Sequence, residues 1–340
     1  MQVDRFIGVG ENIHCTRIYK VGGKYCQPNA QGGHDLVYQD GKDTRRLPVP
    51  AAFTGQADWQ AGRVKHCAVA LWQGNYGGDA ERAQAVDYLH TLARQQAAAG
   101  ATYLDINVDE FSTDTAERVR LMQWTVGVVQ QAVSIPMSID SSNQEILQAG
   151  LQAASVAGRA RPMVNSVSLE RTSAIEVAAR HGAVVIASAA GETGLPSTPE
   201  ERLANFARLF PRLQAAGFAL SDIHADPLVF PISTDGENGK RFLATVRAVR
   251  ETYGPAIHIV AGLSNVSFGM PQRSLINQVF AHLAVEAGAD GGIVDPLQIN
   301  ARILSKLDTA AEDYKLARAL LLGDDEYGMN YIAAFRGKTL

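Results

Sequence analysis

Short apolar runs, many of them rich in β-branched residues, alternate along this chain with longer amphipathic or Ala-rich stretches. The stretch 115–133 is typical of the longer kind, because Val119, Met122, Val126 and Val129 recur at the spacing of one helix face. The short runs have the length and composition of buried strands. The pattern predicts strands at residues 5–13, 102–108, 135–141, 162–167, 183–188, 223–229, 257–264 and 291–295.

Glycines mark the ends of several predicted helices. Gly100, Gly182 and Gly288 each stand between a helical stretch and the next apolar run, where glycine can take the left-handed conformation that ends a helix. A doubly wound open sheet also alternates strand and helix. Eight units with polar residues at nearly every strand end favour a closed (β/α)8 TIM barrel instead, as a single domain over residues 1–340.

Two segments fall outside the regular alternation. Residues 14–78 are rich in Gly, Gln and Pro, and only 50–62 has helical character. Connections in β/α units usually have about 2–6 residues, so we expect a largely structureless insertion after the first strand, serving as a lid or a docking element on the catalytic face. The tail 323–340 is expected to be a C-terminal extension, with a short helix at 326–335 packed against the barrel.

Composition and charge exclude several classes of protein. Hydrophobic residues make up 46% of the chain and charged residues 19%, which is typical of a compact fold with a large core. A net charge of −4 and scattered Lys and Arg argue against a nucleic-acid partner. No apolar stretch reaches the roughly 20 residues of a membrane span, and the N-terminus lacks a signal-peptide pattern. The sequence therefore predicts a cytoplasmic protein without membrane association.

Polar residues stand at the C-terminal ends of the predicted strands. Asp and Asn commonly cap the following helix, so any one of them is open to that structural interpretation. It is a weaker explanation for all of them together, because several stand inside the strand-end sequence before the turn begins. The candidate site residues selected in this way are Asp105, Asn107, Asp140, Asn165, Asp226 and Asn265.

The chemistry of these side chains indicates the kind of ligand. Phosphate or carboxylate ligands would demand cations or a Gly-rich helix N-terminus, and neither pattern is present. Carboxylates and amides suit a neutral ligand with several N–H donors. A pterin or a similar fused pyrimidinone presents a 2-amino group and a ring N–H side by side, and one carboxylate can accept both.

A metal site is the weaker interpretation. His14, Cys15, Cys26, His34, His66 and Cys67 lie in or beside the insertion, and His and Cys are zinc ligands. No Cys-x-x-Cys or His-x-x-x-His spacing occurs, so the prediction is that no metal is bound and that the three cysteines are reduced thiols. His224, near Asp226, is a candidate proton carrier, with a packing role as the stronger alternative.

Several motifs in this order resemble those of the methyltetrahydrofolate:corrinoid methyltransferases. That family shares a pterin-binding barrel with the folate domain of cobalamin-dependent methionine synthase and with dihydropteroate synthase. The resemblance covers roughly residues 5–13 and 80–310. The motifs are Tyr103-Leu104-Asp105-Ile106-Asn107-Val108, Ile139-Asp140-Ser141-Ser142-Asn143, Asn165-Ser166-Val167-Ser168, Asp226-Pro227-Leu228-Val229, Ala261-Gly262-Leu263-Ser264-Asn265 and Gly291-Gly292-Ile293-Val294-Asp295-Pro296.

The resemblance implies an activity and a set of roles. A methyl group would move between N5 of tetrahydrofolate and the cobalt of a corrinoid (cobalamin) carried by a partner protein, in either direction, and the enzyme would be a homodimer. Asn265 would hydrogen-bond N5. The other implied folate contacts are Asp140, Asn165 and Asp226 at the pterin edge, and Gly262, Ser264 and Arg273 beside it. Phe268 stands where family members often have Gln, which is a departure.

Two alternatives from other classes stay open. A dihydropteroate synthase would need a Lys-bearing, Gly-rich loop after the sixth-strand Asp, whereas this chain reads Asp226-Pro227-Leu228-Val229-Phe230-Pro231. A non-catalytic folate-binding subunit would use the 14–78 insertion to dock on a larger assembly. Methyl transfer from methylcobalamin to tetrahydrofolate distinguishes the enzyme from the binding subunit.

Overall fold

The computed structural model of the protein describes residues 6–156 and 158–336. Eight parallel strands close into a barrel, in the order β1-β13-β12-β11-β10-β9-β8-β7. Each predicted strand is confirmed, with ends that differ by up to three residues, because propensity locates a strand better than it locates its ends. The strands are β1 (Ile7–His14), β7 (Tyr103–Asn107), β8 (Met137–Asp140), β9 (Met163–Val167), β10 (Val184–Ser188), β11 (Ile223–Asp226), β12 (His258–Gly262) and β13 (Gly291–Val294).

The chain divides into two compact units. Among the described residues, the C-terminal unit comprises 6–10, 99–103 and 163–336, and the N-terminal unit comprises 11–98, 104–156 and 158–162. Strands β9 to β13 belong to the C-terminal unit. Strand β8 and the last residues of β1 and β7 belong to the N-terminal unit. The candidate residues therefore fall into two groups, one in each unit.

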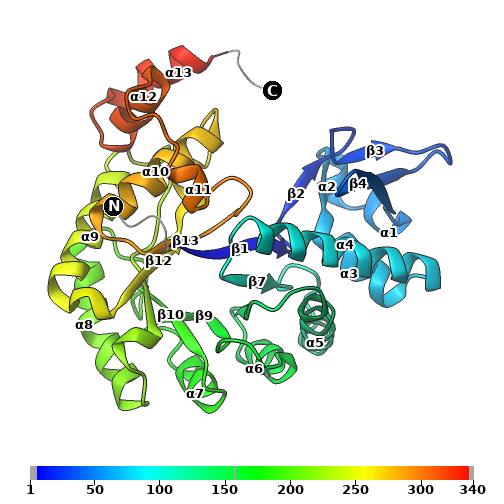
Figure 1. Cartoon of the computed structure of the whole chain (residues 1–340), viewed down its shortest axis with the longest axis horizontal. Coiled ribbons are helices and arrows are strands. Elements are labelled where there is room, and N and C mark those ends of the chain that lie inside the picture. The colour runs from blue at the N-terminus through cyan, green and yellow to red at the C-terminus, as the bar shows by residue number, and fades with distance from the viewer. Residues whose placement is uncertain (1–5, 157, 337–340) are drawn as a thin grey trace. The chain divides into compact units, whose positions relative to one another are not determined.

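The C-terminal unit repeats the β/α motif around a core of strand side chains. Val9, Met163, Val184, Ile186, Val260 and Ile293 form a buried cluster on its strands. Such layers of branched side chains fill the interior of a β/α barrel. Helices lie outside these strands in Figure 1: α7 (Ser173–Arg180), α8 (Pro199–Ala215), α9 (Asn238–Tyr253) and α10 (Arg273–Ala287).

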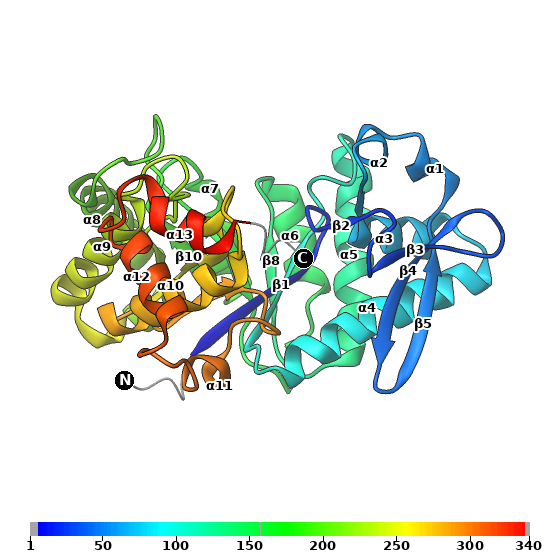
Figure 2. The same ribbon diagram turned by 90° about the horizontal axis from the view of Figure 1, so that it is seen from above.

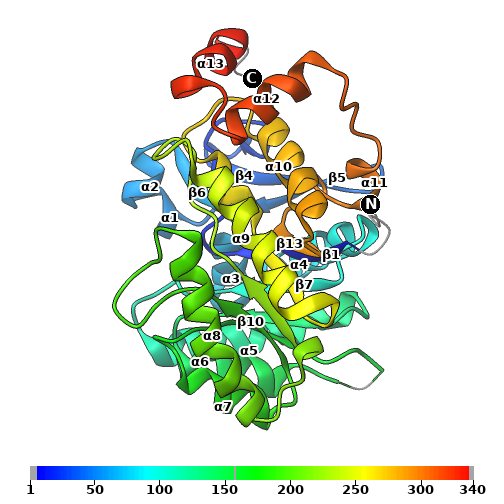
Figure 3. The same ribbon diagram turned by 90° about the vertical axis from the view of Figure 1, so that its left-hand side faces the viewer.

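A C-terminal extension continues this unit. After α11 (Ala301–Leu304), α12 (Glu312–Leu321) lies beside α10, as Figure 3 shows. The helix expected at 326–335 is confirmed as a short 3-10 turn, η5 (Glu326–Gly328), followed by α13 (Met329–Phe335). Tyr331 on α13 is fully buried, and its hydroxyl donates to the backbone oxygens of Pro271 and Gln272 at 3.4 Å. The extension is thereby attached to the loop that precedes α10.

The N-terminal unit carries the other β/α elements. Its helices include α4 (Asp79–Ala98), α5 (Thr115–Ala132) and α6 (Gln144–Ala153). The predicted helix at 115–133 is confirmed as α5, which begins after the N-cap Asp114 and buries Met122, Val126 and Val129. Gly100, Gly182 and Gly288, which follow α4, α7 and α10, have φ values of 101°, 60° and 111° and therefore end their helices in the left-handed region as predicted.

The insertion is folded, so the expectation of a largely structureless segment is wrong, and the helix expected at 50–62 is confirmed only in part. It contains a three-stranded antiparallel sheet of β3 (Cys26–Pro28), β4 (His34–Asp40) and β5 (Asp43–Pro48). A ladder between β2 (Ile18–Lys20) and β6 (Arg63–Lys65) closes its base. The 50–62 stretch holds only two single turns, α1 (Ala51–Thr54) and α2 (Ala57–Gln60), and α3 (His66–Tyr76) completes the segment.

Cross-strand pairing and packing on α4 explain this outcome. Leu36 pairs with Leu47 on neighbouring strands, and both side chains are fully buried. The sheet lies along α4, as Figure 2 shows, where the Tyr38 hydroxyl donates to Asp87 at 2.7 Å. Such hairpins are specified by long-range contacts more than by local propensity, so the composition of residues 14–78 does not reveal them. No helix within residues 6–156 or 158–336 has the length and apolar character that a membrane span requires.

Candidate functional site

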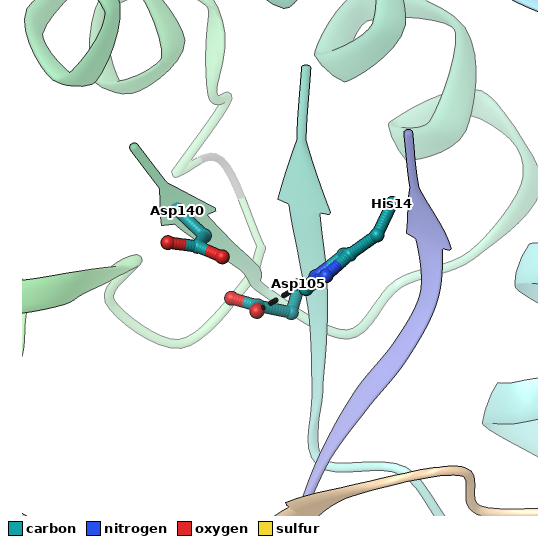
Figure 4. A group of neighbouring side chains, drawn as sticks. All are labelled: His14, Asp105 and Asp140. Carbon is teal, nitrogen blue, oxygen red and sulfur yellow. Dashed lines mark hydrogen bonds and ion pairs between the residues drawn. The ribbon is translucent and has the colours of Figure 1, made fainter. Parts of the chain in front are cut away.

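His14, Asp105 and Asp140 converge in the N-terminal unit (Figure 4). His14 and Asp140 are the last residues of β1 and β8, and Asp105 is the middle residue of β7. Nε2 of His14 and Oδ2 of Asp105 are 2.9 Å apart and share a hydrogen bond. Asp105 is fully buried, His14 is 8% exposed, and Asp140 is half-buried. One donor or acceptor atom from each residue lies within 4.8 Å of the others. The predicted candidates Asp105 and Asp140 are therefore neighbours, with a histidine beside them.

Asn107 orients Asp140. The Asn107 amide donates to Oδ2 of Asp140 at 2.9 Å, and its own oxygen accepts from the backbone N–H of Asp109. Asp109 in turn accepts from the Ser141 hydroxyl at 2.6 Å. These bonds fix the carboxylate of Asp140 from the neighbouring strand, which is the rigidity that a binding group needs.

The electrostatics of this group are unusual. Burial lowers the pKa of His14, but the hydrogen bond to Asp105 and the negative charges of Asp105, Asp140 and Glu11 outweigh burial, so the pKa is raised. Burial and the neighbouring Asp105 raise the pKa of Asp140, against the opposing effects of His14 and Asn107. A proton is therefore held within the group more tightly than isolated side chains would hold it.

The His and Cys residues considered as zinc ligands do not converge. In the described part of the chain, His14, Asp105 and Asp140 form the one group of three or more His, Cys, Asp or Glu with potential ligand atoms this close. His66 instead pairs through Nδ1 with the Tyr88 hydroxyl at 2.9 Å, and burial lowers its pKa to about 3. Burial raises the pKa of Cys67 to about 12, which disfavours the thiolate that zinc binds.

Asp226 is the central carboxylate of the C-terminal unit's group. It ends β11, is half-buried, and accepts from the backbone N–H of Leu228 at 2.8 Å. Burial raises its pKa to about 6, although the Leu228 N–H and the charge of Arg202 act in the opposite direction. Asp226 is consequently a strong acceptor at neutral pH and loses its charge in mild acid.

Arg202, on the first turn of α8, is a residue that the sequence did not identify. Its side chain is fully buried, its guanidinium lies 5.3 Å from the centre of the Phe230 ring, and its Nη1 donates to Thr245 at 3.4 Å. Nε and Nη2 have no hydrogen-bond partner among the described residues. In sequence it stands after Pro199, Glu200 and Glu201, where an arginine is normally solvated. Only the tertiary structure places its charge close enough to lower the pKa of Asp226.

Asn265 lies on a short 3-10 helix, η4 (Leu263–Ser267), directly after β12. A Cβ atom at Gly262 would lie 3.0 Å from Nδ2 of Asn265, so glycine makes room for this amide. Arg273, at the start of α10, braces the loop by donating to the backbone oxygen of Ser264 at 3.1 Å and to the Ser267 hydroxyl at 3.0 Å. Its guanidinium stacks on the exposed ring of Phe268 at 4.4 Å.

The helix-cap explanation fails for the four residues Asp140, Asn165, Asp226 and Asn265. The N-cap positions of α6, α7, α9 and α10 are occupied by Asn143, Thr172, Glu237 and Gln272. The N-cap of η4 is Gly262. None of the four side chains is therefore a helix N-cap.

His224 is a packing residue in this structure. It is 3% exposed, its ring stacks on that of His258 at 4.8 Å, and it meets Tyr103 edge-on. Burial lowers its pKa to about 3, so the ring stays neutral at physiological pH. This geometry favours the structural interpretation over proton transfer.

The fold and the strand-end chemistry define a β/α-barrel protein with polar residues at the C-terminal ends of its strands. Residues 78–295 match the family model described as "Pterin binding enzyme". The chain belongs to the pterin-binding enzyme family.

Relatives agree with this assignment. The chain is 32% identical over 256 residues to a methylcorrinoid:tetrahydrofolate methyltransferase of Eubacterium limosum, covering 73% of this chain and 87% of that protein. It is 32% identical over 222 residues to a methionine synthase of Mycobacterium leprae, covering 61% of this chain but only 18% of that protein.

Solved structures support the fold. A 7,8-dihydropteroate synthase from Vibrio fischeri superposes with a TM-score of 0.53 at 16% identity, covering 94% of each chain. The dihydropteroate synthase of Stenotrophomonas maltophilia superposes with a TM-score of 0.51 at 19% identity, covering 69% of this chain and 88% of that one. At these identities the likeness concerns architecture alone.

Proposed function

We propose that this protein is a methyltransferase that moves a methyl group between a corrinoid carried on a partner protein and N5 of tetrahydrofolate. The observation that carries the proposal is the position of Asn265, an amide on η4 just beyond β12, for which Gly262 leaves room. The name of the Eubacterium limosum relative supports the same reaction class, with transfer toward tetrahydrofolate.

Three residues are assigned to the pterin edge. The 2-amino group and the adjacent ring N–H would donate to one carboxylate, for which Asp226 is suited because it is charged at neutral pH. Asp140, held by Asn107, is a second acceptor, and the Asn165 amide serves atoms that both donate and accept. The support for these roles is the chemistry of each side chain and membership of the pterin-binding family. Asp140 belongs to the N-terminal unit, and Asn165 and Asp226 belong to the C-terminal unit.

Asn265 is assigned to the reacting nitrogen. When tetrahydrofolate is methylated, the N5 lone pair forms the new C–N bond, the carbon–cobalt bond breaks, and its electron pair stays on cobalt as Co(I). The N–H proton of N5 then leaves to solvent. In the reverse direction N5 is a poor leaving group unless positive charge on it is supported. The Asn265 amide can accept from a protonated N5 or donate to a neutral one, so it serves both directions.

Arg273, Ser264 and Gly262 act through the loop. Arg273 ties Ser264 and Ser267 together, which fixes the path of η4 around Asn265. The exposed Phe268 ring lies flat on the Arg273 guanidinium. We propose that this stacked pair flanks the folate beyond the pterin, where an apolar ring suits the aminobenzoyl portion better than a polar side chain would.

Methyl transfer itself tests the proposal. Methylcobalamin and tetrahydrofolate are mixed with the protein, and the cobalamin absorption spectrum is followed anaerobically. Conversion of methyl-Co(III) to Co(I) with formation of 5-methyltetrahydrofolate is expected. Asn265→Ala should slow transfer roughly 100- to 1000-fold, whereas Asn330→Ala, an exposed amide on α13, should not. Binding of tetrahydrofolate without transfer from free or protein-bound methylcorrinoid would favour a binding subunit.

The insertion is proposed as the docking element for the corrinoid protein. Val21 N–H donates to the Gly62 oxygen at 2.9 Å, so residues 22–61 can be replaced by a short linker while the β2–β6 ladder is kept. Transfer from free methylcobalamin should survive, and transfer from the methylated corrinoid protein should fall. Equal retention with both donors would refute docking, as would an equal loss with both.

A further inference from the structure

The cluster of His14, Asp105 and Asp140 contains a group to which the proposed reaction gives no role, namely His14. We propose that His14 is a positioning residue that carries the counter-charge for the buried Asp105 and the half-buried Asp140, and so keeps Asp140 ionised as a pterin acceptor. The inference rests on the proposed folate site and deepens it. His14 acts through Asp105 and Asp140 and does not itself contact the folate.

The geometry supports a shared proton between His14 and Asp105. The two side chains come from adjacent regions of the N-terminal unit, β1 and β7, and Nε2 and Oδ2 are 2.9 Å apart. Asp105 is 0% exposed and His14 8% exposed, so water contributes little to stabilising either charge. Figure 4 shows Asp140 on β8 facing this pair. A charged imidazole in this position is a hydrogen-bonded counter-ion for both carboxylates.

The charged groups around His14 are acidic, so its positive charge offsets theirs. The charged groups that act on His14 from the surrounding elements are Asp105 on β7, Asp140 on β8 and Glu11 on β1, and Asp109 also acts on Asp140. All four are acidic, and Glu11 is already ion-paired with Arg17. Two close carboxylates without a cation cannot both remain ionised at low cost, so one would take up a proton. The acidic neighbours raise the pKa of His14, and His14 in turn lowers the pKa of Asp140 against the effects of burial and Asp105, as this arrangement of charges requires.

The protonation state of Asp140 determines how well it can bind a pterin. A pterin edge presents N–H donors, and an ionised Asp140 accepts them. A protonated Asp140 would place its own O–H among those donors and lose at least one hydrogen bond. By offsetting negative charge, His14 extends the ionised form of Asp140, and therefore folate binding, toward lower pH.

The pH profile of folate binding tests the inference. Tetrahydrofolate affinity is measured by anaerobic titration from about pH 5 to pH 9 for wild type and for His14→Gln, which keeps an N–H donor but no charge. The midpoint should move to higher pH by about one unit, equivalent to about tenfold weaker binding in mild acid. In mild alkali the affinities should converge, because Asp140 is ionised in both proteins. The titration of Asp226 contributes to both profiles equally.

A matched control separates charge from folding. His282 is also 8% exposed, and its Nδ1 pairs with the Tyr314 hydroxyl at 2.9 Å, so His282→Gln removes a comparable buried bond elsewhere. That variant should keep the wild-type pH profile. A His14→Gln loss of the same size at every pH would indicate a merely structural role and overturn the inference. An unshifted midpoint would overturn it as well.

Two measurements are independent of folate. Histidine NMR of wild type should show one imidazole, absent in His14→Gln, that stays protonated above its ordinary range, and Asp105→Asn should lower its pKa. Elemental analysis after incubation with zinc or manganese should find no ion that depends on His14. A stoichiometric, His14-dependent metal would overturn the inference, since the ion would replace the shared proton. If wild type binds no folate while the NMR result holds, the proposed function fails and the His14 charge assignment stands.

Discussion

Asp226→Asn should make the protein more stable at neutral pH while weakening its hold on folate. Burial raises the pKa of Asp226 from 3.8 to about 6, and this value already includes the opposing effect of Arg202. Because a tenfold change in a proton-binding constant is worth about 1.36 kcal/mol, the difference between 3.8 and about 6 corresponds to about 3 kcal/mol. A raised carboxyl pKa contributes stability in acid, and that contribution is lost as the pH rises through about 6. Asparagine resembles the protonated carboxyl and avoids the loss.

Denaturant unfolding over a range of pH measures this effect. The variant should exceed wild type by up to about 3 kcal/mol near pH 7.5, and the difference should shrink to nearly zero by about pH 4. Asp308→Asn is the matched control, because Asp308 accepts from the N–H two residues on, as Asp226 does, but is exposed. It should show no pH-dependent gain. A variant less stable than wild type at neutral pH, or a difference that does not vary with pH, would refute the reasoning.

The same substitution should have the opposite effect on the ligand. Hydrogen bonds to charged groups typically contribute about 1.5–3 kcal/mol, so replacing the carboxylate should weaken tetrahydrofolate binding roughly 10- to 150-fold. Stability gained and affinity lost at one position is the expected signature of a binding residue. Unchanged affinity in a direct titration would remove Asp226 from the folate site.

Three further predictions follow from single contacts. Gly262→Ala should lower the transfer rate with little change in folate affinity, since the new Cβ would lie 3.0 Å from Nδ2 of Asn265; steady-state kinetics showing a fall in affinity alone would contradict this. Arg202→Met should raise the pH at which folate binding is lost, because its charge lowers the pKa of Asp226; an unmoved pH profile would count against that role. Gly291→Ala should destabilise the barrel by about 1–3 kcal/mol or more, because its Cβ would lie 2.0 Å from the Ile7 oxygen. Denaturant unfolding measures this, and wild-type stability would contradict the packing.

The strands and most of the helices could be predicted because their signals are local. A buried strand needs a run of apolar residues, and a helix needs a periodic face and an end, as at Gly100 or Asp114. The same runs located Asp140 and Asp226 at strand ends, Asn165 within β9 and Asn265 just beyond β12. The insertion could not be predicted in this way, because the pairing of Leu36 with Leu47 and the contact of Tyr38 with Asp87 join distant parts of the chain.

The sequence by itself determined the (β/α)8 architecture, the residues at the strand ends and the kind of ligand they suit, since these depend on residue type and order. The tertiary structure alone decided which side chains share a charge environment. His14 looked like one of several candidate metal ligands until folding placed it 2.9 Å from Asp105, 91 positions away. Arg202 has no distinguishing signal in the sequence, and only the fold buries its guanidinium where its charge acts on Asp226. Electrostatic interactions act through distance in space, which the order of residues does not specify.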